Sequence, residues 1–353
     1  MPNDMFSIKA KWSKWLIPSL VALFIFSSFS PDEQQTATDA EEQRCVPGAQ
    51  PFYGYTFLYP DIINKNAAYA PFLLRWDDYY AQYYFGKDIQ REENIKEWIE
   101  RFCEKPDPAD VEYVVYKSNF DELVRLRDAT LDKTKKTPLP YLLGGNTFAE
   151  MLAYNGCVEV IDYLMYAKKC EPYVIAQGDG WTLPERDTEA MYELINEGLG
   201  RFAQTESHFV RLRYAYQIVR MAHYARNWTY TIDLYNYLIP KVDLKKPSIV
   251  FYWTVGHLAG AYQKTGKYPE AAYRYSLLFR HCPSKRVQAY RSFLIRNDKD
   301  WEQTLRLCGS DAEKATLYVL RASGSRTRAV EDMRQIYSLD PANSQLELLL
   351  ISD

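Results

Sequence analysis

The sequence lacks the short motifs that most catalytic sites need. Its 353 residues include only 15 glycines and no glycine-rich phosphate loop. Its four histidines, at positions 208, 223, 257 and 281, have no metal-binding spacing and no nucleophile signature beside them. Its six cysteines, at positions 45, 103, 157, 170, 282 and 308, form no C-x-x-C pair, which argues against a zinc or redox site. We therefore expect no catalytic residue, no metal and no cofactor.

The sequence also lacks a basic run with interleaved aromatic residues. Its net charge is −3, so binding to nucleic acid has little electrostatic support and we expect no such partner. The even number of cysteines permits disulfide bridges in an oxidising compartment. Cys157 and Cys170 would lie about 20 Å apart on one continuous helix and could not pair with each other. Buried free thiols are the preferred interpretation.

Aromatic residues are abundant. The chain holds 30 Tyr, 16 Phe and 8 Trp, within 47% hydrophobic and 25% charged residues. This composition is typical of a folded protein with a large core, and rings of this size commonly fill the space between packed helices. A minority of the rings could instead form a platform for a carbohydrate or a peptide, because helical spacing alone does not separate the two uses.

The N-terminus is typical of an export signal. Lys9, Lys11 and Lys14 precede the apolar run at 15–29, WLIPSLVALFIFSSF. The run would rise only about 22 Å as a helix, less than the hydrocarbon core of about 30 Å. Residues 1–30 are therefore predicted to be a signal peptide, or else a retained anchor that contacts the membrane, and cleavage is left open. Everything after the run is expected on the periplasmic side of the inner membrane, in the cell envelope.

Residues 31–50 are polar and acidic and are predicted to be a flexible linker. Residues 51–140 form an aromatic-rich head, irregular at first, with a helix expected over 88–105. Asp107 followed by Pro108 predicts a helix start, and Asn119 is expected to cap the next helix. A rival hypothesis places a hydrolase or glycan-binding site in this head, using carboxylates such as those at positions 77, 78 and 92.

The most ordered pattern runs from 252 to 283, YWTVGHLAGAYQKTGKYPEAAYRYSLLFRHCP. Gly266 stands where the first helix would turn, because glycine takes left-handed dihedrals without a Cβ penalty. Ala271 stands where two helix backbones would approach most closely, and Pro283 closes the unit. Similar but looser patterns surround Gly156, Trp228 and Gly324. A shorter segment at 285–308 fits poorly.

In residue type and spacing this stretch resembles a tetratricopeptide (TPR) repeat. The resemblance implies an all-α fold, in which residues 141–353 form a TPR-like right-handed solenoid of helical hairpins behind the head. A head followed by such a tail is also similar to large uncharacterised envelope proteins of Bacteroidota. Neither resemblance implies a catalytic activity. The expected function is that of a non-catalytic envelope scaffold that binds a protein or peptide.

In TPR proteins, set positions of each first helix line the inner surface. The matching positions here carry five Arg or Lys and one acid, which predicts a basic, aromatic groove for an extended peptide or its terminal carboxylate. A purely solvated face is the alternative. The candidate groove residues are Arg213, Tyr216, Arg220, His223, Tyr224, Trp253, Gln263, Lys264, Lys314, Tyr318 and Arg321.

The final residues, SQLELLLISD, resemble half of a further hairpin. An apolar helix without a partner predicts that another chain covers Leu346, Leu349 and Leu350, which would allow self-association, or that the reading frame continues beyond Asp353.

Overall fold

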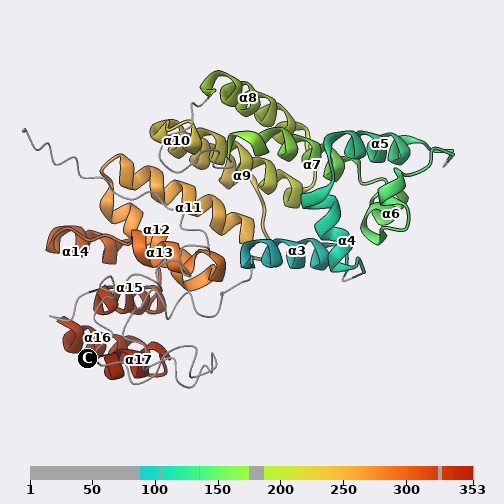
Figure 1. The fold of residues 1–353 in the computed structure, drawn as a ribbon. Coiled ribbons are helices and arrows are strands. Elements are labelled where there is room, and N and C mark those ends of the chain that lie inside the picture. The colour runs from blue at the N-terminus through green and yellow to red at the C-terminus, as the bar shows by residue number, and fades with distance from the viewer. Residues whose placement is uncertain (1–87, 104, 135, 175–186, 325–327, 353) are drawn as a thin grey trace, which may run out of the picture. The chain divides into compact units, whose positions relative to one another are not determined.

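The computed structural model describes residues 88–103, 105–134, 136–174, 187–324 and 328–352 (Figure 1). These residues form helices and turns and contain no strand, which confirms the all-helical prediction. All of them belong to one compact unit, Gly48–Asp353. The apolar run at 15–29, the linker and residues 51–87 lie outside the described residues. Among the helices that the structure does describe, none is long and apolar enough to span a membrane.

The α-helices follow one another along the chain with short connections. In order they are α3 (Ile89–Arg101), α4 (Pro108–Glu112), α5 (Phe120–Leu131), α6 (Thr147–Tyr154), α7 (Val158–Cys170), α8 (Thr188–Gln204), α9 (His208–Tyr224), α10 (Trp228–Leu238), α11 (Ile249–Lys264), α12 (Tyr268–His281), α13 (Arg286–Ser292), α14 (Asp298–Arg306), α15 (Asp311–Gly324), α16 (Ala329–Leu339) and α17 (Gln345–Ser352). Short turns of other helix types are η3 (Tyr113–Lys117, a π-helix), η4 (Tyr141–Leu143), η5 (Glu171–Tyr173), η6 (Ile239–Lys241) and η7 (Pro283–Lys285).

Local sequence explains where several of these helices begin. The Asp107 carboxylate accepts a hydrogen bond from the Ala109 N–H, and Pro108 occupies the first turn of α4. Asn119 caps α5 and exchanges hydrogen bonds with Glu122 in a reciprocal capping box. Both predicted helix starts are confirmed.

Two predicted turns are confirmed as well. Gly156, between α6 and α7, has a φ of 66°, and Gly266, between α11 and α12, has a φ of 78°. Side chains rarely tolerate this left-handed region, so glycine allows each chain reversal to be tight. Beyond the second turn, Ala271 of α12 is buried, as the close approach of α11 and α12 requires.

Consecutive helix pairs pack against one another within the array. In each pair, α9 with α10, α11 with α12 and α15 with α16, the two helices lie against each other. Helix α11 also packs against α9 and α10, so the first two pairs are direct neighbours (Figure 1). Helices α13 and α14 lie between the second and third pairs in the sequence and pack on α12.

Helix α3, from the predicted head, accepts hydrogen bonds from the N-termini of later helices. The Glu97 carboxylate accepts hydrogen bonds from Ser248 Oγ at 2.7 Å and from the Ile249 N–H at 2.8 Å, at the N-terminus of α11. The Glu93 carboxylate accepts from the Ser284 N–H in η7 at 3.3 Å. Trp98, the residue after Glu97, is 1% exposed and belongs to the same hydrophobic core as α5 to α10. The described part of the head therefore shares its core with the array.

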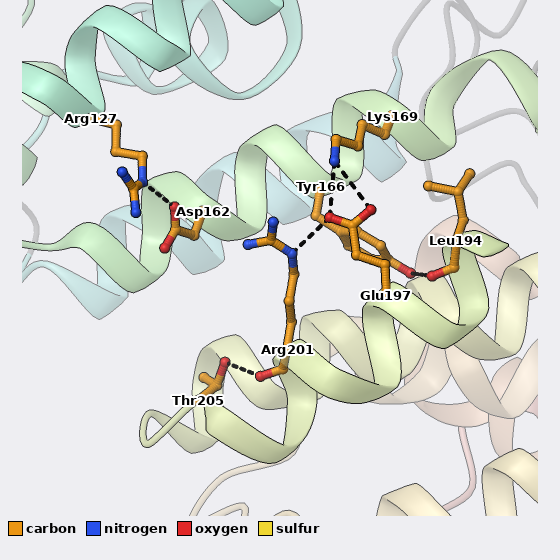
Figure 2. A network of polar contacts seen from close by, with 8 residues as sticks. All are labelled: Arg127, Asp162, Tyr166, Lys169, Leu194, Glu197, Arg201 and Thr205. Carbon is orange, nitrogen blue, oxygen red and sulfur yellow. Dashed lines mark hydrogen bonds and ion pairs between the residues drawn. The ribbon is translucent and has the colours of Figure 1, made fainter.

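Charged residues on α7 and α8 form a paired network. Figure 2 shows Glu197 of α8 accepting from Lys169 Nζ at 3.0 Å and from Arg201 Nε at 2.9 Å. Tyr166 of α7 donates to the Leu194 carbonyl of α8 at 2.8 Å. These bonds fix α8 on α7 and leave each of these charges with a partner.

At the C-terminal end, α17 packs on α15 and α16. Leu349 is buried in the core of the preceding helices, and Leu346 is half-buried against it. Leu350 is exposed. The expectation that all three leucines need a second chain is therefore wrong for Leu349, which this chain covers.

Candidate functional site

Three of the candidate side chains, together with Gln217, recur along one face of α9. Arg213, Gln217, Arg220 and Tyr224 follow at intervals of four, three and four residues, a spacing that places them in one row on a helix. We call these four residues the α9 row. Its members differ in burial and partners, and those differences separate structural residues from binding candidates.

Arg213 is a structural residue. It is 1% exposed, and its Nη1 lies 3.3 Å from a Glu97 oxygen on α3 while its Nη2 donates to Asn94 at 3.1 Å. Its guanidinium is stacked between the rings of Trp98 and Phe209, at 4.3 and 4.2 Å from their centroids. The prediction that Arg213 lines an open groove is wrong, because α3 covers it.

Arg220, two turns further along α9, is different. It is half-buried, and within the described residues it makes no ion pair and no hydrogen bond. Its guanidinium carbon lies 5.7 Å from the ring centroids of both Tyr216 and Tyr224. Burial alone would lower the pKa of Arg220, but Tyr216 and Tyr224, together with Tyr163 and Cys170, outweigh it and the pKa is raised. The side chain is therefore a permanent cation that no described residue pairs with a counter-charge.

Imidazole rings from two helices lie beside this cation. The His257 ring of α11 lies 5.8 Å from the ring of Tyr216 and 4.8 Å from that of His223. Burial lowers the pKa of His257 well below its ordinary value, and the positive charges of His223, Arg220 and Lys285 lower it further. His257 is consequently neutral at pH 7 and does not add to the charge of Arg220.

A glycine makes this contact between α9 and α11 possible. His223 Nδ1 donates to the His257 carbonyl oxygen at 3.1 Å. A Cβ on Gly260 would meet His223 Cε1 at 2.8 Å, so no larger residue fits there without displacing the imidazole. Gly260 thus holds the two helices close at the site.

The remaining candidate residues are scattered. Trp253 is buried against Tyr216, with a ring distance of 5.7 Å, so neither ring is an open surface. Gln263 is half-buried and bonds to the Ser292 carbonyl and the Tyr275 hydroxyl, whereas Lys264 is exposed at the end of α11.

The candidates on α15 contact α14, α16 and α15 itself. Arg321 forms two bonds to the fully buried Asp332 of α16 and lies 3.6 Å from the ring centroid of Trp301. Tyr318 packs on the same tryptophan at 5.2 Å, and Lys314 pairs with the exposed Asp311. Arg321 is therefore wrong as a groove residue, since its charge is neutralised inside the protein.

Two residues of this site, His257 and Gln217, were not proposed from the sequence. His257 was noted only for lacking metal spacing, although it lies one helical turn after Trp253 on α11. Gln217 belongs to the α9 row by spacing and could have been found by extending the row between the two arginines. Its Oε1 atom is buried without a hydrogen-bond partner, and the residue is 6% exposed.

A separate cavity of about 570 Å³ lies between α8, α9 and α10. Its two cations already have partners within the chain. Arg211 bonds to the Thr205 carbonyl at the end of α8 at 3.0 Å, and Lys241 lies 3.1 Å from the ring centroid of Tyr237. The cavity is therefore a less favourable candidate for a ligand site than Arg220, which no described residue pairs.

The rival carboxylate site cannot be assembled from the described head. Positions 77 and 78 lie outside the described residues, and Glu92 is exposed in the first turn of α3. The described residues hold no group of three or more His, Cys, Asp or Glu placed to bind a metal. Their five cysteines are all free, with Cys170 and Cys282 buried and Cys103 exposed.

Comparison with known proteins adds no relative: no family model matches the chain, and no curated protein or solved structure matches it either.

Proposed function

We propose that this chain is a non-catalytic scaffold that binds a protein or peptide partner through α9 and α11, in a TPR-like right-handed array of helix pairs. The observation that carries the proposal is Arg220, a half-buried cation that lies among aromatic side chains and has no counter-charge in the part of the chain that the structure describes. The paired charges of α7 and α8 show what structural ions look like in this protein (Figure 2). Leaving a partly buried charge unpaired is unfavourable, and an external partner would relieve that cost.

The array supports the proposal through its packing. The pairs α9 with α10 and α11 with α12 are stacked neighbours, with Gly266 at the turn of the second pair. Stacked pairs of this kind present a row of first helices to a ligand. Arg220 and His257 lie on the first helices of two adjacent pairs, so one extended ligand could contact both.

The proposal can be tested with a displayed library of short random peptides selected on the full chain. Peptides that bind are synthesised, and their affinity is measured by fluorescence anisotropy at low and high salt. We expect Arg220→Glu to weaken binding strongly, and Lys264→Glu to weaken it mainly at low salt because Lys264 is exposed. A matched control is Arg125→Glu, at an exposed arginine of α5. Equal affinities for the wild type and the Arg220→Glu protein would contradict the proposal.

We also propose that the scaffold works in the cell envelope, outside the cytoplasm. The support is the lysine-flanked apolar run at 15–29. A fusion of residues 1–50 to alkaline phosphatase, which is active only after export, should give active enzyme. Removing residues 15–29 should abolish that activity, and activity that persists without them would count against export through this run.

A further inference from the structure

The α9 row offers a ligand two complementary groups. Arg220 supplies hydrogen-bond donors and a positive charge, and none of the described residues gives it an acceptor. Gln217, one turn earlier, supplies an acceptor, Oε1, that has no donor. A buried polar atom without a partner is rare in folded proteins and calls for an explanation. A half-buried cation and a buried acceptor without a donor, on one helix face, point to a single ligand that contacts both.

The orientation of Gln217 follows from its other neighbour. Burial raises the pKa of Tyr163 on α7, and a hydrogen bond with Gln217 opposes that rise. A hydrogen bond lowers a phenol pKa when its donor faces the phenolic oxygen, so the amide nitrogen of Gln217 is engaged by Tyr163. The amide oxygen is left without a partner, in agreement with its burial.

The charge of the site selects among anions. A phosphate carries nearly two negative charges and three strong acceptor oxygens, whereas the row has one unpaired cation beside a neutral His257. A carboxylate carries one charge and matches the fork of one guanidinium. The acceptor of Gln217 additionally needs an N–H or O–H from the ligand, which a simple inorganic anion does not supply.

The spacing fits one stretch of extended peptide. Gln217 and Arg220 are separated by about 4.5 Å along the axis of α9, and an extended chain advances about 3.4 Å per residue. An acidic side chain and the backbone N–H of its own or the next residue are therefore far enough apart to reach Arg220 and Gln217 at the same time. The ring of Tyr224, which is half-buried, flanks the guanidinium and would contact the aliphatic part of that side chain.

We infer that the α9 row binds an acidic residue within an extended peptide, with the Asp or Glu carboxylate on Arg220 and a peptide N–H on the Oε1 of Gln217. This inference rests on the proposed function and adds the chemistry of the bound residue. It requires the Gln217 side chain to rotate, because its Oε1 is closed to solvent in the unbound chain.

The experiment uses the peptides selected on the full chain. Each binder is resynthesised in two further forms, one with its acidic residue changed to the amide and one with an amidated C-terminus. We expect the acid-to-amide change to weaken binding about ten- to a hundredfold, as a lost charged hydrogen bond would. Amidation of the C-terminus should leave the affinity unchanged.

Two variants assign the contacts. Arg220→Gln should weaken binding of the original peptide by the same factor as the acid-to-amide change weakens binding to the wild type. Combining the two changes should weaken binding little further, because both remove the same interaction. Gln217→Leu should weaken binding about three- to tenfold. Because it also removes the partner of the buried Tyr163, Tyr163→Phe is its stability control: it breaks the same hydrogen bond and should leave the affinity unchanged. A merely structural glutamine would give the same affinity in both variants. Arg125→Gln on α5 is the matched control and should change neither the affinity nor the unfolding midpoint.

The outcomes separate this inference from the proposed function. If no peptide binds, both fail. If peptides bind but show no preference for an acidic residue, or bind the Arg220→Gln protein equally well, the inference fails and peptide binding stands. Loss of binding on amidation of the C-terminus would also overturn it, since the ligand would then be the chain terminus.

Discussion

At the residue scale, burial and partners separate three arginines that the sequence presents alike. Arg213 is stacked and paired with α3, Arg321 is paired with Asp332, and Arg220 has no counter-charge. The repeat pattern placed all three in one groove because it assigns positions within a helix pair. It says nothing of Glu97, which comes from the head and contacts α9 only in the folded chain. The sequence therefore predicted a set of candidate positions. The folded structure was needed to tell which of them is already paired within the chain.

His257 predicts a pH dependence of stability. Its pKa in the folded chain lies well below the ordinary value of 6.5, because of burial and of the charges of His223, Arg220 and Lys285. As the pH falls below 6.5, the unfolded chain takes up a proton that the folded chain does not. The free energy of unfolding must then fall, by up to about 1.4 kcal/mol per pH unit.

Urea unfolding at neutral and mildly acidic pH measures this effect. His257→Phe removes the titrating group, so the decline in the free energy of unfolding should become shallower than in the wild type. His281, whose pKa is also lowered by burial and by Arg280 despite the opposing effect of Glu313, contributes equally to both proteins and cancels in the comparison. Parallel declines would show that His257 titrates normally in the folded state.

At the element scale, local sequence predicted where helices start and turn. Asp107 with Pro108, Asn119, Gly156 and Gly266 act through the backbone within a few residues of themselves, and such signals can be read without the fold. The position of α3 was not predictable in this way. Its apolar side, with Trp98, was visible from the periodicity, but its acidic side contacts helix N-termini that come far later in the chain.

The contacts of α3 with α9 and α11 lead to a prediction about stability. Glu97→Ala removes the counter-charge of the buried Arg213 and two hydrogen bonds at the start of α11. Removing one partner of a buried pair typically costs about 3–5 kcal/mol, because the other charge is left unpaired. We expect a loss of that size in the free energy of unfolding, measured by urea denaturation.

The control for this prediction lies on the same helix. Glu100 is exposed and only 3.9 Å from Lys96, so Glu100→Ala should change the free energy of unfolding by at most about 0.5 kcal/mol. Similar losses in the two variants would mean that α3 does not fasten the array.

At the scale of the whole molecule, the described chain is an all-helical protein whose head and array share one core. The all-helical class was predictable because hydrophobic periodicity near 3.6 residues extends over most of the sequence. The shared core was not, because the change from aromatic-rich to repeat-like composition near residue 140 predicts two regions. Packing joins them through α3.

This arrangement explains why Arg213 is paired within the chain and Arg220 is not paired with any described residue. Helix α3 occupies the N-terminal end of α9 and neutralises Arg213, while Arg220 lies two turns beyond it. The α9 row thus contains one arginine whose charge is paired with a carboxylate and one whose charge is not paired with any described residue. We propose that Arg220 marks the surface where a peptide binds.

Site-specific photo-crosslinking tests this claim most directly. A benzophenone amino acid replaces Tyr224, which flanks Arg220, or Tyr337, an exposed tyrosine of α16, and each protein is irradiated with a selected peptide. The account predicts a covalent adduct from position 224 that excess unlabelled peptide suppresses, and none from position 337. An adduct from position 337 alone, or from neither position when the affinity of both proteins is unchanged, would contradict it.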